Sequence, residues 1–125
     1  MKLVTILAFG MLGVASRHGV NELASRYFPF PFPTVTLLIN VLGSLAIGAV
    51  YVASVEKAAL SETLRLGLMV GFLGGFTTFS AFSLEIFLLW QWKQTAIALG
   101  YAVLSPVLGF LSALLGATLA RWALA

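Results

Sequence analysis

The sequence predicts an all-α membrane protein with four transmembrane helices. Of its 125 residues, 61% are hydrophobic and 9% are charged, whereas a soluble globular domain carries roughly 25% charged residues. A chain with so few polar side chains cannot cover a surface that faces water, so its natural solvent is a lipid bilayer. The nearly continuous apolar runs at 37–55 and 96–120 suit membrane helices, because each crossing takes about 20 mostly apolar residues.

The first predicted span covers about residues 3–23. Lys2 followed by an apolar run also fits a signal peptide, but removal of this segment would leave three spans, so we expect a membrane helix. The span ends before residues 28–33, which read Phe-Pro-Phe-Pro-Phe-Pro. Prolines at every second position forbid helix there.

The other three spans are predicted at about residues 34–55, 62–92 and 95–124. Ser61 is a candidate N-cap for the third span. That span is too long for one plain crossing, and its middle carries two adjacent glycines followed by Thr77 and Thr78. These residues are poor helix formers, so we predict a break near residues 74–78.

The charges on the connecting loops hardly favour one orientation. Four spans place both termini on one side of the membrane, and the bias of lysine and arginine between the two sides sets orientation. The predicted sides carry four basic residues (Lys2, Lys57, Arg65 and Arg121) and three (Arg17, Arg26 and Lys93). This balance predicts a dual-topology protein whose copies pair antiparallel.

Small residues recur at four-residue spacing in the third and fourth spans. They form the series Gly67/Gly71/Gly75, Ser105/Gly109 and Ser112/Gly116. Such spacing lets helices approach closely in lipid, either inside one chain or between two chains. The sequence leaves both options open.

Polar side chains also occur inside the predicted spans, where they are costly and tend to be functional. Thr36 and Asn40 share a helix face, as do Tyr101 and Ser105. Taken singly, a buried asparagine can simply join two helices, and a serine can bond the preceding turn. Several polar residues along one face instead favour a wet path through the membrane.

Other classes of function find little support. The chain has no cysteine and one histidine, His18, which excludes disulfides and a metal site of several histidines within one chain. The basic residues are scattered, so no nucleic-acid partner is expected. No Ser/His/Asp set or carboxylate pair indicates an enzyme.

Three motifs resemble those of the Fluc family of bacterial fluoride channels, also called CrcB proteins. They are Gly10-x-x-Gly-x-x-x-Arg17, Thr36-Leu-x-Ile-Asn40-x-x-Gly43 and Gly71-Phe-x-Gly-Gly-Phe-Thr-Thr-Phe-Ser-x-Phe-Ser83. The third motif is highly specific, and the resemblance covers essentially the whole chain. Two positions depart from the family: His18 replaces an aromatic residue and Val35 replaces a glycine.

The resemblance implies an antiparallel homodimer in the bacterial inner membrane, with two pores that let fluoride leave the cytoplasm passively. The implied fluoride-pore residues are Thr36, Asn40, Phe79, Ser80, Phe82, Glu85, Tyr101 and Ser105. Arg17 is implied at a pore vestibule. The backbone carbonyls of Gly74 and Thr77 are implied as ligands of a structural Na⁺ at the dimer interface.

Two alternatives remain at this point. A proton-coupled small multidrug exporter is also a four-helix dual-topology dimer, but residues 9–15 in the middle of the first span contain no carboxylate and Glu22 lies at its end. A membrane assembly subunit without transport activity would explain the small-residue series but not the polar faces.

Overall fold

The computed structural model describes residues 1–28 and 31–125, and all regular secondary structure in them is helical. Four helical segments are long and apolar enough to cross a membrane. The fold is therefore all-α with four candidate spans, as predicted. The elements are α1 (Lys2–Tyr27), α2 (Thr34–Tyr51), η1 (Val52–Glu56), α3 (Glu62–Leu66), η2 (Gly67–Leu73), α4 (Gly74–Phe76), α5 (Ser80–Gln91) and α6 (Thr95–Ala123).

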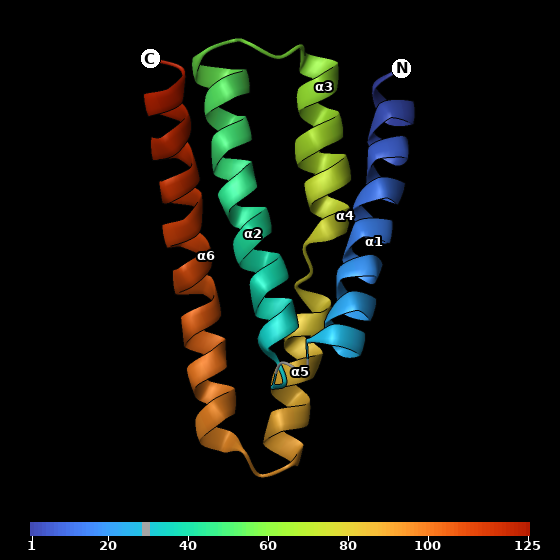
Figure 1. Ribbon diagram of the computed structural model, residues 1–125, viewed down its shortest axis with the longest axis vertical. Helices are drawn as coiled ribbons and strands as arrows, with labels where there is room; N and C mark the ends of the chain where they lie inside the picture. The colour runs from blue at the N-terminus through green and yellow to red at the C-terminus, as the bar shows by residue number, and fades with distance from the viewer. Residues whose placement is uncertain (29–30) are drawn as a thin grey trace.

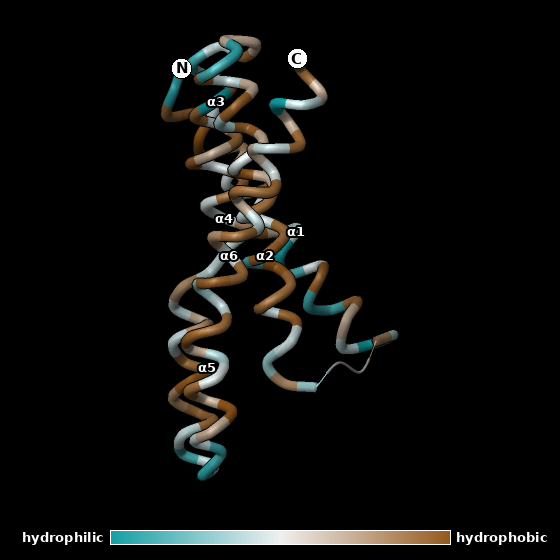
Figure 2. The backbone as a smooth tube through the Cα atoms, turned by 90° about the vertical axis from the view of Figure 1, so that its left-hand side faces the viewer, coloured by the Kyte–Doolittle hydropathy of each residue, from teal (hydrophilic) through white to brown (hydrophobic). Residues whose placement is uncertain are grey.

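The helices run up and down in one bundle. Both termini lie at the end that carries the loop between η1 and α3, and the turn between α5 and α6 lies at the opposite end (Figure 1). Helix α2 packs mainly on α6, and α1 packs on η2 and α4. The lower ends of α1 and α2 diverge from α5 and α6 (Figure 2).

Local chemistry explains where the helices begin and end. The Ser61 hydroxyl accepts a hydrogen bond from the Leu64 N–H at 3.2 Å. Ser61 is therefore the N-cap of α3, as predicted. Helix α1 continues to Tyr27, beyond the predicted end at residue 23. Phe28 is the first residue that directly precedes a proline, and its backbone is extended. The part of the proline run at residues 29–30 lies outside the described residues.

The outer surface is strongly apolar. Val103, Phe110 and Trp122 on α6 are 67%, 69% and 81% exposed. Large exposed apolar patches are rare on soluble monomers, but lipid tails solvate them without cost. The exposure therefore agrees with a bilayer around the bundle.

The glycine series serves close packing inside the chain. A Cβ atom on Gly71 would lie 2.6 Å from the Ile6 carbonyl oxygen, and one on Gly75 would lie 2.7 Å from the Gly10 carbonyl oxygen. Helix α1 and the third span therefore touch backbone to backbone along this stripe. Of the two options left open by the sequence, the structure shows packing within one chain for these glycines.

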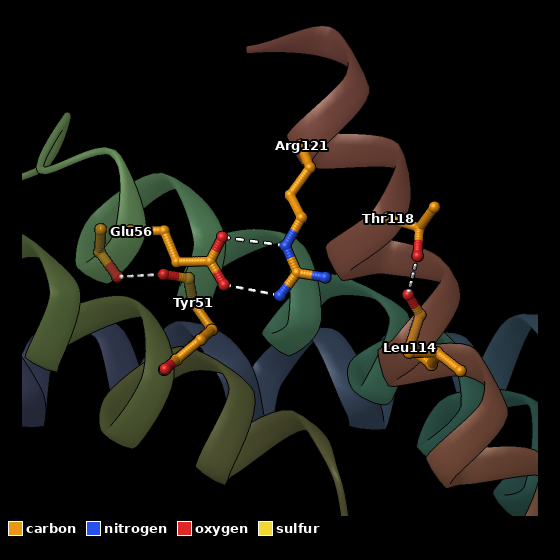
Figure 3. A network of polar contacts seen from close by, with 6 residues as sticks. Tyr51, Glu56, Leu114, Thr118 and Arg121 are labelled. Carbon is orange, nitrogen blue, oxygen red and sulfur yellow. Dashed lines mark hydrogen bonds and ion pairs between the residues drawn. The ribbon is translucent and has the colours of Figure 1, made fainter. Parts of the chain in front are cut away.

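Ion pairs tie the helix ends together where the termini lie. Arg121 donates to both carboxylate oxygens of Glu56, at 2.9 and 2.6 Å (Figure 3). Lys2 pairs with Glu62 at 2.8 Å. All four side chains are solvent-accessible, so each pair contributes little by itself. Together they connect α1 to α3 and η1 to α6.

We expect Gly48→Ala to destabilise the bundle. A Cβ at Gly48 would overlap the carbonyl oxygen of Ala113, and the backbone of α6 cannot yield without separating from α2. Overpacking of this kind costs about 1–3 kcal/mol, which would appear as a lower melting temperature of the purified protein in detergent. Gly100→Ala is the control, since a Cβ there meets nothing within 4 Å. Equal melting temperatures for both variants would contradict the packing described here.

Candidate functional site

The site is organised around an irregular segment in the third span. Helix α4 ends at Phe76, Thr77 is extended with ψ of 161°, and α5 begins at Ser80. The prediction placed the break at residues 74–78, but Gly74 and Gly75 remain helical and Gly75 packs tightly on α1. The non-helical residues are 77–79.

Threonine hydroxyls satisfy part of the interrupted backbone. Thr77 donates its hydroxyl to the Leu73 carbonyl at 2.8 Å. The Thr78 hydroxyl accepts from the N–H of Ala81, in the first turn of α5, at 3.2 Å. Polar backbone groups in a membrane must find partners inside the protein, and these side chains supply two of them.

Side chains from two other helices hold the same segment. Asn40 on α2 donates its Nδ2 to the Thr78 carbonyl at 2.9 Å, and its Oδ1 accepts from the Thr78 N–H at 2.8 Å. Arg17 on α1 donates its Nη1 to the Thr77 carbonyl at 3.2 Å. The irregular segment is thus fixed from both sides by predicted site residues.

A first cavity of about 430 Å³ lies beside this segment. None of its described lining residues is charged. Phe82 in its wall is 8% exposed, whereas Phe79 is 78% exposed. Ser105 is buried, and its hydroxyl makes no hydrogen bond among the described residues. The cavity brings together the predicted residues Asn40, Gly74, Thr77, Phe79, Phe82 and Ser105.

The aromatic rings form a connected row. The Phe79 and Phe82 ring centroids are 5.8 Å apart. The Phe82 and Tyr101 rings meet edge to face at 4.9 Å. Because the edge of such a ring carries partial positive charge, this row offers weak attraction to an anion without a formal charge.

A second cavity of about 490 Å³ lies on the other side of Thr78 and contains Arg17, Thr36, Ser80 and Glu85. Both carboxylate oxygens of Glu85 accept hydroxyl hydrogens: Oε1 from Thr36, and Oε2 from Tyr101 at 2.9 Å. Tyr101 lines neither of these two cavities, but it links Glu85 to the Phe82 ring. Seven of the eight predicted pore residues therefore line the two cavities that flank Thr78, and Tyr101 contacts two of them.

Two polar residues on α1, Asn21 and Ser25, were not among the predicted site residues. Asn21 lines the second cavity and, with Ser25, a third cavity of about 410 Å³ that also reaches Thr36 and Glu85. Arg17, Asn21 and Ser25 are spaced four residues apart, so they share a helix face. This spacing is the signal in the sequence from which they were predictable.

Comparison with known proteins identifies the family of this chain. Residues 4–117 match the family described as "CrcB-like protein, Camphor Resistance (CrcB)". A protein of Granulibacter bethesdensis named "Fluoride-specific ion channel FluC" is 47% identical over 117 residues, which is 93% of this chain and 92% of that protein.

Two further relatives carry the same name. One from Paracoccus denitrificans is 43% identical over 90% of this chain and 88% of its own length. One from Saccharophagus degradans is 46% identical over 79% of this chain and 74% of its own length. With a match over nearly its whole length and relatives this similar, the chain belongs to the CrcB family.

Proposed function

We propose that this chain forms a fluoride-selective channel, which lets fluoride leave the bacterial cytoplasm passively across the inner membrane. The observation that carries the proposal is the uncharged first cavity, where Phe79 and Phe82 lie beside the Asn40 amide and the Ser105 hydroxyl. The relatives named fluoride-specific ion channels support a channel rather than an enzyme.

The chemistry of the cavity suits a small, strongly hydrated anion. Amide N–H and hydroxyl groups replace the water molecules that fluoride loses on entry. Ring edges add weak attraction, and no lysine or arginine is among the described residues that line this cavity, so none traps the ion there. Fast conduction needs this balance between entry and release.

Arg17 and Glu85 belong to the path on the other side of Thr78. The Arg17 guanidinium gives the second cavity a positive charge that draws anions in. The Glu85 carboxylate would repel them, but the hydroxyls of Thr36 and Tyr101 hold both of its oxygens. We assign Thr36, Ser80, Glu85 and Tyr101 to the polar continuation of the pore, with Arg17 at its vestibule.

The working channel in this proposal is an antiparallel, dual-topology homodimer with two pores. Three observations support it: the balanced basic residues, the large apolar surface, and the exposure of Phe79. Phe79 projects from the irregular segment of the third span, where a second copy would cover its ring. Each pore would then draw on both chains.

The irregular segment also suits a structural Na⁺ ion. In membrane proteins, carbonyls at the ends of interrupted helices coordinate sodium. Gly74 lies near such an end and is exposed, and a Cβ there would meet only the Met69 carbonyl oxygen, at 3.9 Å. The Thr77 carbonyl accepts a hydrogen bond from Arg17 at 3.2 Å, and its second lone pair stays available for the ion. Two carbonyls from each of two chains would make a site of neutral oxygens.

Fluoride efflux from liposomes tests the function. Purified wild-type protein should release fluoride and retain chloride. Phe82→Ile and Phe79→Ile should each slow fluoride efflux at least about tenfold, because an aliphatic side chain has no positive edge. Phe87→Ile is the matched control, since Phe87 lies on α5, as Phe82 does, but outside the first cavity. If both site variants released fluoride as fast as the wild type, Phe79 and Phe82 would serve packing only and would not contact the ion.

Cysteine labelling tests the orientation. The chain has no cysteine, so Ala125→Cys provides a single label at the C-terminus. We expect about half of the molecules to react from each face of the membrane, since the basic residues are balanced. Adding Ala59→Arg and Lys93→Gln should shift labelling to the cytoplasmic face. Labelling of the single variant from one face only would contradict dual topology.

A further inference from the structure

The two hydrogen bonds of Asn40 involve both backbone groups of one residue. Its amide oxygen accepts the Thr78 N–H at 2.8 Å and its amide nitrogen donates to the Thr78 carbonyl at 2.9 Å. This is the exchange that a neighbouring β-strand would make with Thr78. Asn40 therefore gives both backbone groups of Thr78 a hydrogen-bond partner from a different helix.

The Thr78 N–H has a competing partner in its own span. In a continuous α-helix each N–H bonds the carbonyl four residues earlier, which for Thr78 is the Gly74 carbonyl. The hydrogen bond to Asn40 diverts this N–H. The Gly74 carbonyl is thereby left for another ligand. Without Asn40, the Thr78 N–H would have no partner inside the membrane and would bond the Gly74 carbonyl instead.

The neighbouring contacts preserve this arrangement. Gly43 lies three residues after Asn40 on α2, and a Cβ there would overlap the Thr77 side chain. The absence of a side chain at Gly43 lets α2 approach the irregular segment closely enough for the Asn40 amide to reach it. Arg17 fixes the Thr77 carbonyl from the α1 side.

We infer that Asn40 is a positioning residue for a cation: by holding the Thr78 N–H, it keeps the third span open and the Gly74 carbonyl free to coordinate Na⁺. This inference rests on the sodium site proposed above. It adds a second role for Asn40 beside that of a donor to fluoride. The two roles use different groups, because Oδ1 holds the Thr78 N–H, whereas Nδ2 carries a second hydrogen, beside the one donated to the Thr78 carbonyl, that would donate to fluoride.

Sodium-dependent thermal stability tests the inference without any measurement of transport. The melting temperature of the purified protein is recorded against Na⁺ concentration, with N-methyl-D-glucamine as the replacement cation. We expect Asn40→Ala to raise the Na⁺ concentration for half-maximal protection at least about tenfold, because the Gly74 carbonyl loses its availability. Ser105→Ala is the matched control: it should slow fluoride efflux and leave the Na⁺ response unchanged.

A proline at position 78 separates positioning from general destabilisation. Proline has no N–H, so Asn40→Ala combined with Thr78→Pro cannot close the span onto Gly74 and should regain the wild-type Na⁺ response. Thr78→Pro alone should keep that response, and Thr77 already has the extended backbone that precedes proline. If Asn40→Ala does not fold, the Na⁺ response of the Thr78→Pro single variant is the deciding measurement, and loss of that response overturns the inference.

The outcomes distinguish the two proposals. A wild-type protein whose stability ignores Na⁺ would overturn the sodium site and the role of Asn40 with it. If the wild-type protein responds to Na⁺ and Asn40→Ala changes the Na⁺ concentration for half-maximal protection by less than about twofold, the role of Asn40 is overturned but the sodium site is not. Failure of the double variant to regain the response would show that Asn40 does not act through the Thr78 N–H.

Discussion

The pair of hydrogen bonds between Asn40 and the backbone of Thr78 is the contact on which the rest of the site depends. A membrane offers no water to an interrupted helix, so each freed N–H and carbonyl needs a partner within the protein. Asn40 on α2 and Arg17 on α1 bond the backbone of residues 77–79 and fix its conformation. The Phe79 ring, the first cavity and the second cavity are all placed by that conformation.

The close approach of the helices makes these hydrogen bonds possible. Glycines on the third span pack against the backbone of α1, and Gly48 and Gly116 bring α2 and α6 together. Lipid tails give helices no hydrophobic reason to associate, so van der Waals contact along such stripes must hold the bundle. A short asparagine or an arginine then reaches backbone atoms on a neighbouring helix.

Local residues were sufficient to predict much of the fold. The apolar runs indicated four spans, and Ser61 marked the start of the third because a cap acts within one turn. The length of α1 was underestimated, since the prediction ended the helix with its apolar stretch, whereas the helix continues through polar residues up to Phe28, the residue before the first proline. The place where the third span leaves the helix was also set by packing, because the contact of Gly75 with α1 keeps that glycine helical.

The candidate site was predictable as a set of residues but not as a set of contacts. Asn40 was recognisable as a buried amide, yet its partner Thr78 is 38 positions away in the chain, and only the tertiary fold brings them together. The same holds for Arg17, whose reach toward the Thr77 carbonyl no local pattern encodes. Asn21 and Ser25 were within reach of the sequence, because their four-residue spacing from Arg17 was visible.

The ion pairs at one end of the bundle have a consequence for the electrical behaviour of a channel. Lys2–Glu62 joins α1 to α3 and Arg121–Glu56 joins η1 to α6 where the termini lie, while the helices diverge at the opposite end. In an antiparallel pair, each face of the bilayer meets one tied end and one splayed end. The two antiparallel pores would present their barriers in opposite order, so the current summed over both pores at a given voltage would have equal size in both directions. Rectification would then require an asymmetry from outside the protein, such as unequal lipid charge in the two leaflets.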